Sequence, residues 1–481
     1  MLIRNARVWP SGEATADVRM AAGRVVECGP GLRPAGGEEV LDAGGYALLP
    51  GLHDHHVHLR ALAAADGSVR VGPDQVRSAA ELAARLAAAD AAAAPGGWLR
   101  CVGYHESVAG PLDRWALDRL AANPARPVRV QHRTGALWVV NSAGLAALGL
   151  DDVDPGGGAA GGELAGVERD AAGRATGRLW RMDRWLATRV PGRAAELAAG
   201  LAAVSARAAA RGVTGFTDAT PGATGPDLAG LAAAVADGTI AQRLHCMAPA
   251  DESMAAHGRF SLGPVKVLLD DDRLPTLDEL ADLVRQAHAA RRPVAVPCVT
   301  QVQLVLTLAA LDLAGRLPGD RIEHGAVIPA ELVPDLRGLT VVSQPHFVAE
   351  RGEQYASDVA ADDLPGLWRL RTLIEGGVAV AAGSDAPFGR ADPWHLIRAA
   401  TIRPAGLGPG EAVAPATAIG LLLGEPSAPG APRLIAAGTR ADLILLRCPP
   451  REALGSLASD LVAVTFIDGE RVPRATGSGA S

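Results

Sequence analysis

Residues 50–59 of this 481-residue chain read PGLHDHHVHL and contain four of its twelve histidines. They continue an apolar run and predict a buried strand whose carboxyl end carries several histidines. Side chains two residues apart on a strand share a face, so His56 and His58 are expected to point together. Two buried imidazoles at a strand end are costly unless something binds them, and a divalent metal is the usual ligand. His53 and His55 have the opposite parity, and we expect them to face the surrounding helices.

Similar β-branched runs recur along the chain and alternate with alanine-rich stretches that are typical of helices. The expected parallel strands are residues 47–58, 212–219, 243–248, 264–270, 293–299, 321–325, 340–344 and 378–385. Eight such strands, each followed by a helix, predict an α/β fold, a (β/α)8 TIM barrel. Catalytic residues of this architecture gather at the carboxyl ends of the strands.

Both ends of the chain have the alternation and the frequent Gly and Pro of short antiparallel strands. We expect residues 1–48 and 430–475 to form one β-sandwich domain, and residues 49–59 and 206–429 to form the barrel. Residues 60–205 then form an inserted α/β subdomain between the first and second barrel strands. This segment contains Trp98, Trp115, Trp138, Trp180 and Trp185. The tryptophans could form its own core, or it could be an active-site lid in which some of them touch substrate.

Four polar residues lie at or near the ends of later strands: Lys266, His324 in IEHG, His346 in SQPHF and Asp385 in GSDAP. Any one of them could be an ordinary polar residue at a strand–loop junction. Their coincidence with the histidine pair at one rim favours a metal-dependent active site.

Lys266 is the single lysine among 46 lysines and arginines. A GC-rich genome would replace lysine by arginine wherever charge alone matters. A lysine amine can react with carbon dioxide to give an anionic carbamate that binds metal, whereas arginine cannot. The alternative is a chance survivor that pairs with a carboxylate of residues 270–272.

Composition excludes several other classes of protein. The net charge of −7 argues against nucleic acid or an anionic membrane as the main partner, which leaves a small-molecule substrate. The five cysteines form no disulfide framework and no CxxC motif, as expected in a reducing compartment. No signal-peptide core and no run of about 18 apolar residues occurs. We therefore expect a cytoplasmic protein.

The set of motifs resembles the amidohydrolase superfamily, and within it the amidohydrolase-3 branch of N-substituted formamide deformylase-like enzymes. The matching stretches are PGLHDHHVHL, VNSAGL, GVTGFTDA, PVKVLLD, RIEHG, VVSQPHF, AAGSDAPFGRADPW and GTRADLILL. The resemblance implies the barrel, the sandwich and the insertion, and it makes a homodimer the common oligomer. It implies zinc or another divalent metal, held by His56, His58, a carboxylated Lys266, His324 and Asp385. Asp385 would also be the general base and acid.

The resemblance fails at the fifth strand, where family members carry a metal-binding histidine. This chain reads VAVPCVTQ there and has Pro297, which offers no lone pair to a metal. Cys298 has the wrong parity to replace the histidine, and His346 lies one strand further round. One metal keeps all its expected ligands, while the second loses one. We therefore expect one tight site and a doubtful second site, with His324 free to orient substrate or transfer protons.

The leading functional hypothesis is a hydrolase of a C–N bond other than a peptide bond, in an amide, formamide or cyclic amide. The alternative is a cyclase, lyase or isomerase recruited to a specialised pathway on the same fold. A non-catalytic binding protein is disfavoured, because it has little use for five converging polar groups. Loop residues select the substrate, and the sequence does not identify it.

Overall fold

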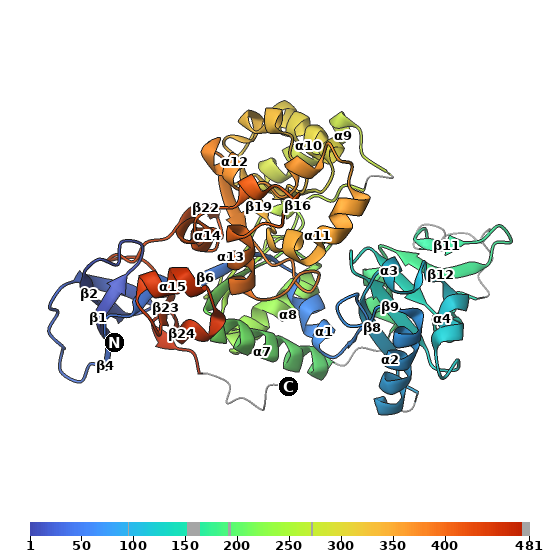
Figure 1. The fold of residues 1–481 in the computed structure, drawn as a ribbon, viewed down its shortest axis with the longest axis horizontal. Helices are drawn as coiled ribbons and strands as arrows, with labels where there is room; N and C mark the ends of the chain where they lie inside the picture. The colour runs from blue at the N-terminus through green and yellow to red at the C-terminus, as the bar shows by residue number, and fades with distance from the viewer. Residues whose placement is uncertain (95, 152–163, 191–193, 271–272, 474–481) are drawn as a thin grey trace. The chain divides into compact units, whose positions relative to one another are not determined.

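A computed structural model of the chain describes residues 1–94, 96–151, 164–190, 194–270 and 273–473 (Figure 1). The chain divides into two compact units, Met1–Leu59 with Leu201–Ser481 and Arg60–Gly200. None of the helices in the described residues combines the length and the hydropathy that crossing a membrane requires.

Both ends of the chain meet in one sheet of the first unit. Its order is β25-β24-β23-β5-β1-β2-β3, and β4 pairs with β1. The strands are β1 (Leu2–Val8), β2 (Thr15–Ala21), β3 (Arg24–Gly29), β4 (Val40–Asp42), β5 (Ala47–Pro50), β23 (Leu443–Leu446), β24 (Val462–Ile467) and β25 (Glu470–Arg471). Ile3, Leu48, Leu443 and Phe466 belong to one buried apolar cluster. Side chains from both ends of the chain therefore hold this sheet together.

The centre of the first unit contains two parallel sheets, with orders β15-β14-β13-β6 and β16-β17-β18-β19-β20. Their strands are β6 (Leu52–Val57), β13 (Val213–Asp218), β14 (Arg243–Cys246), β15 (Phe260–Leu262), β16 (Val265–Lys266), β17 (Val294–Cys298), β18 (Arg321–His324), β19 (Thr340–Ser343) and β20 (Ala379–Ala382). Each of the eight expected segments contains one of them. Only Gly263 and Pro264 separate β15 from β16, so residues 260–266 continue from one sheet into the other. The mixed α/β fold is consistent with the expected barrel.

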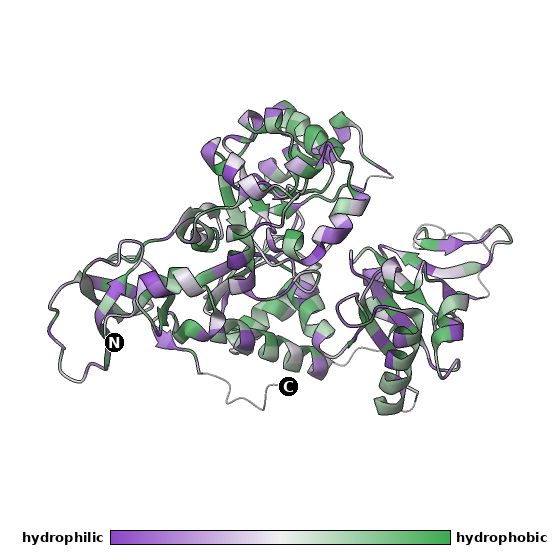
Figure 2. Cartoon of the chain, viewed as in Figure 1, coloured by the Kyte–Doolittle hydropathy of each residue, from purple (hydrophilic) through white to green (hydrophobic). Residues whose placement is uncertain are grey.

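Helices that follow these strands carry buried side chains. They include α8 (Gly225–Ala236), α9 (Leu277–Ala289), α10 (Gln301–Ala314), α11 (His346–Asp358) and α13 (Pro393–Thr401). Helix α9 begins at a capping box in which the Thr276 side chain accepts from the backbone of Glu279, and the Glu279 side chain accepts in return. Leu280, Val284 and Ala287 form its buried face at helical spacing. Hydrophobic and hydrophilic residues accordingly occur on the same helices in Figure 2.

Backbone contacts also join β20 to β6. The Asp385 amide donates to the His56 carbonyl at 2.7 Å, and the His58 amide donates to the Ala386 carbonyl at 2.9 Å. Gly383 makes this approach possible, because a Cβ at that position would lie 2.3 Å from the His56 backbone nitrogen. Glycine is the residue that tolerates such a close backbone contact. The last and first parallel strands therefore meet where the expected site residues lie.

Replacing Gly383 by alanine is expected to destabilise the first unit. The new methyl group would press on backbone atoms of β6, which cannot move aside as a flexible side chain would, and overpacking of this kind costs about 1–3 kcal/mol. Thermal unfolding measures the effect. The control is Gly230→Ala in α8, where a Cβ meets nothing within 4 Å and alanine is the better helix former. A Gly383→Ala melting temperature equal to that of the control would contradict the close contact.

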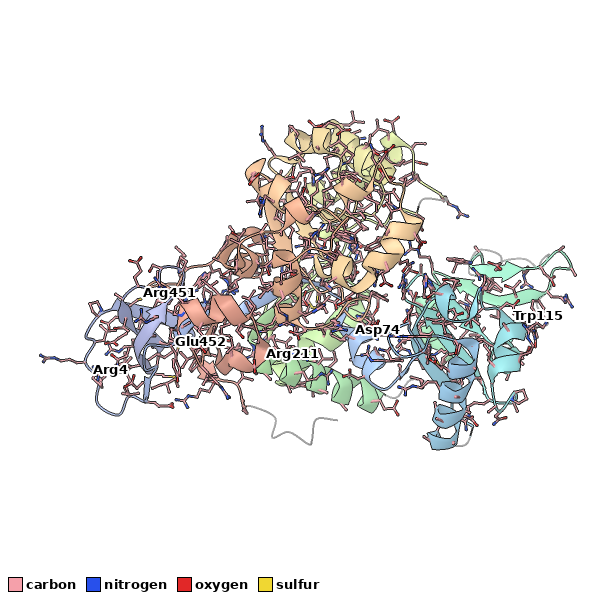
Figure 3. All side chains as sticks on the ribbon, viewed as in Figure 1. Arg4, Asp74, Trp115, Arg211, Arg451 and Glu452 are labelled. Atoms are coloured by element: carbon pink, nitrogen blue, oxygen red, sulfur yellow. The ribbon has the colours of Figure 1, made fainter. Side chains whose placement is uncertain are left out.

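The second unit contains a sheet of order β11-β12-β10-β9-β8-β7. Its strands are β7 (Val69–Arg70), β8 (Leu99–Tyr104), β9 (Val128–His132), β10 (Leu137–Val140), β11 (Val167–Arg169) and β12 (Ala175–Trp180). Trp138 is buried in a cluster against which Trp98 and Trp185 also pack. Trp115, labelled in Figure 3, lies on α4 (Arg114–Leu120) under the guanidinium of Arg174. Three tryptophans thus contribute to this unit's own core.

Candidate active site

A β-bulge in β6 shapes the site. Phe216 and Asp218 of β13 pair with Asp54 and Val57, so β6 has one residue more than its neighbour over this interval. The extra residue changes which face the following side chains point to. His53 and His55 are at odd positions, like the strand's other odd residues, while His56 and His58 are at even positions. Because of the extra residue, odd and even positions here do not lie on opposite faces of the strand.

The expectation that His53 and His55 face the helices is therefore wrong. The His53 ring hydrogen-bonds Thr217 at 2.9 Å, and His55 is fully buried. Burial lowers the pKa of both rings well below the usual range, and the positive charge of Arg321 lowers both further. Arg321 itself contacts Glu323, which reaches His56. All four histidines thus lie on the face of the sheets that carries the site.

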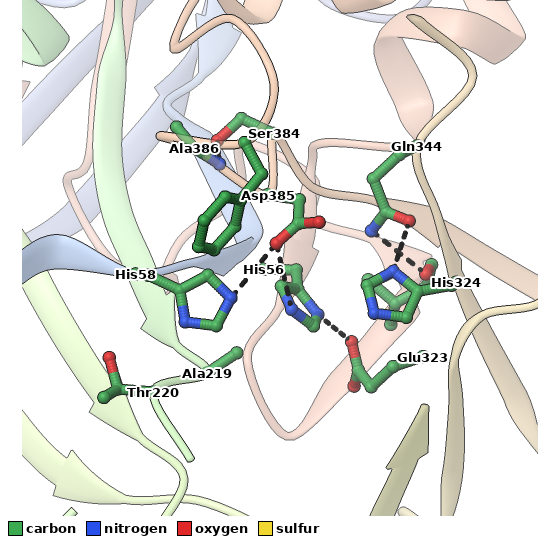
Figure 4. Close-up of polar contacts among 12 residues, drawn as sticks. His56, His58, Ala219, Thr220, Glu323, His324, Gln344, Ser384, Asp385 and Ala386 are labelled. Carbon is green, nitrogen blue, oxygen red and sulfur yellow. Dashed lines mark hydrogen bonds and ion pairs between the residues drawn. The ribbon is translucent and has the colours of Figure 1, made fainter. Parts of the chain in front are cut away.

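Three of the expected ligands converge on one point (Figure 4). The Asp385 Oδ1 atom lies 3.1 Å from His58 Nε2 and 3.5 Å from His56 Nε2. All three ligand atoms lie within 4.8 Å of one another. Ligand atoms that lie about 2.0–2.1 Å from a tetrahedral zinc ion are about 3.3 Å from one another. The separations of the three ligand atoms here therefore suit a tetrahedral zinc ion. His56 Nε2 is buried and has no hydrogen-bond partner among the described residues, as expected of an atom reserved for a metal.

Glu323 belongs to this site although its sequence position did not single it out. Its carboxylate makes a short contact with His56 Nδ1, and both side chains are fully buried. A carboxylate on one ring nitrogen fixes the tautomer and aims the other nitrogen at a metal. Arg321 Nε lies 2.5 Å from the second oxygen of Glu323 and balances its charge. The signal was in RIEHG (residues 321–325), since Arg321 and Glu323 share a parity that places both in the interior.

Burial and charge set the protonation of the cluster. Burial lowers the pKa of His56 and of His324, so both imidazoles favour the neutral form that binds metal. Burial alone would raise the pKa of Asp385, but the hydrogen bond from His58 and the attraction of His56, His324 and His58 in their protonated forms outweigh it. The pKa of Asp385 therefore lies well below its usual range, and the carboxylate is ionised.

His324 lies beside the cluster. Its ring centroid is 4.9 Å from that of His56, and its Nδ1 hydrogen-bonds the Gln344 side chain at 2.9 Å. His324 and Asp385 both adopt positive φ angles, 68° and 50° respectively. Residues other than glycine seldom adopt this conformation, which costs about 1–3 kcal/mol and is concentrated at functional sites.

Lys266 is partly buried near the same groups. Its ammonium donates to the Ala219 carbonyl at 2.7 Å. No carboxylate of the described residues lies within 4.0 Å of it, while Asp271 and Asp272 lie outside those residues. Burial lowers the pKa of the amine, although the carboxylates of Glu323, Asp385 and Asp218 oppose this effect. Lys266 is thus an interior lysine rather than part of a surface ion pair.

The fifth strand supplies no further ligand. Pro297 is buried and pairs with Glu323 of β18. Cys298 Sγ points instead to Thr307 of α10, at 3.4 Å. His346 donates from Nε2 to the Ser384 carbonyl at 3.0 Å and lies outside the His56–His58–Asp385 group. Neither residue replaces the histidine that the resemblance expects at this strand.

Replacing Glu323 by glutamine is expected to weaken metal binding about 10- to 100-fold, the usual cost of losing a carboxylate behind a metal-binding histidine. The amide keeps the shape of the side chain but not the charge that holds the His56 tautomer. Titration with zinc against a competing chelator measures the affinity. The control is Glu350→Gln, which removes the carboxylate that lies 3.2 Å from His395. Equal zinc affinity for Glu323→Gln and the wild type would show that Glu323 does not orient His56.

A known protein resembles this chain over most of its length, and another resembles about a quarter of it. An N-substituted formamide deformylase of Arthrobacter pascens is 27% identical over a 507-residue alignment, covering 92% of this chain and 91% of that protein. A putative amidohydrolase of Bacillus subtilis, YtcJ, is 29% identical over 130 residues, which are 26% of this chain and 25% of that protein.

Solved structures share the fold at low sequence identity. An uncharacterized metal-dependent hydrolase of Pyrococcus furiosus has a TM-score of 0.72 at 19% identity, with 93% of this chain and 99% of that chain covered. A variant of the atrazine chlorohydrolase TrzN of Arthrobacter aurescens, complexed with zinc and atraton, has a TM-score of 0.57 at 15% identity, covering 98% and 94% of the two chains. The model of the amidohydrolase family, amidohydrolase-3, matches residues 39–473. The chain therefore belongs to the amidohydrolase family, as its motifs predicted.

Proposed function

We propose that this chain is a metal-dependent hydrolase that cleaves a C–N bond of a small amide, formamide or cyclic amide. The observation that carries the proposal is the convergence of His56 Nε2 and His58 Nε2 on Asp385 Oδ1, with His56 Nε2 buried and without a hydrogen bond among the described residues. We further propose that the two parallel sheets close a barrel around this cluster. The contacts between Asp385 and His56 and between His58 and Ala386 support that closure.

His56, His58 and Asp385 would hold one divalent ion, for which zinc suits the nitrogen and oxygen donors. When bound, such an ion lowers the pKa of a water molecule and polarises a scissile carbonyl. Asp385, ionised and beside both imidazoles, accepts the proton of the attacking water and returns it to the leaving amine. His324, held by Gln344, orients the substrate or relays a proton. Glu323 keeps His56 in the tautomer that the site needs.

Lys266 would provide an anionic ligand as a carbamate. Its neutral amine attacks the carbon of carbon dioxide, forms an N–C bond and releases one proton, which leaves one negative charge on the new carboxylate. The lowered pKa of the buried amine supports this step, because only the neutral amine is nucleophilic. A partly buried ammonium with no carboxylate of the described residues within 4.0 Å is costly, and carboxylation would remove that cost.

The comparisons support the reaction class. A formamide deformylase matches over most of both chains, and the chlorohydrolase of the same fold was solved with zinc. Pro297 and the absence of a fifth-strand histidine favour one tight metal over two.

Metal content tests the proposal. Protein prepared without chelators is expected to contain at least one tightly bound divalent ion that His56→Ala/His58→Ala loses, as measured by mass spectrometry of the eluted metals. No ion lost in that variant would refute the metal site. A loss of two tight ions would refute the single tight site. The expected activity is release of amine or formate from a panel of amides and formamides.

The changed fifth strand also favours the second candidate, a cyclase, lyase or isomerase. Turnover in water enriched in oxygen-18 distinguishes the two reactions. Hydrolysis places one solvent oxygen in the acyl product, whereas cyclisation, elimination and isomerisation place none.

A further inference from the structure

The inserted unit, Arg60–Gly200, contains a second group of metal-ligating side chains. We propose that His105, Glu106 and His132 form a zinc site there, with all three protein ligands from this unit. His105 and His132 are the only histidines between residues 60 and 200 of the sequence. They are 27 positions apart in the sequence, yet both approach the same carboxylate.

The separations suit a tetrahedral ion. Glu106 Oε2 lies 3.0 Å from His132 Nε2 and 3.8 Å from His105 Nε2. Ligand atoms around zinc are about 3.3 Å apart, so shifts of a few tenths of an ångström would bring each contact to that value. All three ligand atoms lie within 4.8 Å of one another. Two imidazoles and one carboxylate are also a common protein ligand set for a zinc ion that keeps an open position.

Backbone geometry brings the two rings together. Strands β8 and β9 are parallel neighbours, and Tyr104 pairs with His132. His105 directly follows β8, and His132 ends β9, so both side chains emerge at the carboxyl edge of the sheet. Glu106 opens the short helix α3 (Glu106–Ala109) and turns back toward both rings.

Each ring is held at Nδ1 by a hydroxyl two residues further along. His105 Nδ1 lies 2.9 Å from Ser107 Oγ, and His132 Nδ1 lies 2.8 Å from Thr134 Oγ1. A hydroxyl oxygen can accept from Nδ1–H, which leaves Nε2 with the lone pair that a metal needs. Without metal, the backbone amides of Ser107 and Thr134 also donate to Nδ1, and Nε2–H faces Glu106. Zinc binding would move the ring proton from Nε2 to Nδ1 in each histidine.

Solvent can reach this group. The exposed fractions of the side chains of His105, Glu106 and His132 are 16%, 37% and 13%. Three protein ligands leave a fourth position for water or for an anionic group of a bound molecule. An ion here would tie the ends of β8 and β9 to the start of α3.

The test uses the full-length chain in a His56→Ala/His58→Ala background, so that the first site does not contribute. After equilibration with micromolar free zinc and gel filtration, this protein is expected to retain about one equivalent of zinc, and His132→Ala and Glu106→Gln should each remove it. Replacement of zinc by cobalt should give the visible absorption of a tetrahedral ion, lost in the same variants. His257→Ala, at an exposed histidine of the other unit, is the control and should change nothing.

The decisive comparison is between His56→Ala/His58→Ala and the triple variant that also carries His132→Ala. If both proteins retain the same amount of zinc, the proposal is wrong and the three residues are only a hydrogen-bonded cap of α3. Glu106→Gln preserves shape, so its result stands even if His132→Ala fails to fold. The outcome is separate from that of the proposed function, because this site is counted by bound zinc and not by turnover.

Discussion

Asp385→Asn is expected to lower kcat by about 10²- to 10⁴-fold, the usual contribution of a general acid–base group. The amide has nearly the same shape but can neither accept the proton of the attacking water nor return it to the leaving amine. Substrate affinity should change far less, because the imidazoles and the walls of the site remain. The substrate for this test is an amide from the activity panel that the wild-type enzyme hydrolyses. Steady-state kinetics with this substrate gives kcat and KM separately.

The matched control is Asp392→Asn, the same substitution seven residues further along. Asp392 caps α13 by accepting from the backbone nitrogens of Trp394 and His395, and asparagine is an equally good cap. Its kinetics should equal those of the wild type. A near wild-type kcat for Asp385→Asn would contradict the proton-transfer role, and loss of bound metal in that variant would assign Asp385 to metal binding instead.

Lys266→Arg is expected to lower kcat/KM by at least about 100-fold. A metal ion with its full set of ligands stabilises the charge of the transition state by several kcal/mol, and the variant would lack one of these ligands. The substitution keeps the positive charge but cannot form a carbamate. A fully active Lys266→Arg enzyme would end the carbamate hypothesis.

A buried arginine could also disturb packing, so Lys266→Ala provides a second measurement. Alanine leaves a cavity that a small molecule can fill. If Lys266 acts as a carbamate, acetate should restore activity to Lys266→Ala and propylamine should not. Rescue by the amine alone would show that the free ammonium is the active form. Carbon-13 NMR of wild-type protein equilibrated with labelled bicarbonate should also show a bound carbamate.

The strands of the first unit were predictable, because short β-branched runs between alanine-rich stretches carry a strong local signal. Lys266, His324 and Asp385 were predicted as site residues, since each lies at or near the end of such a run. The structure brings Asp385 against His56 and His58, and it places His324 beside them. Those inferences needed only the order of strands in a parallel sheet.

The β-bulge could not be predicted in the same way. Parity along residues 53–58 assumes a regular strand, whereas the register between β6 and β13 shifts twice, with one extra residue in β13 between Val213 and Gly215 and one in β6 between Asp54 and Val57. Pairing between strands sets that register, and it is not encoded in the local pattern. The role of Glu323 was missed for a related reason, because its partner His56 is 267 residues away in the sequence.

The site lies where the two parallel sheets meet. His56 and His58 come from the sheet that contains β6, while Lys266, His324 and Asp385 belong to or directly follow strands of the other. A ligand that binds only the folded chain stabilises it by mass action. Occupancy of this site by the proposed metal ion would therefore add to the cohesion between the sheets, so that the ion would also have a structural role. In such an arrangement, selection for activity and selection for a closed fold act on the same few side chains.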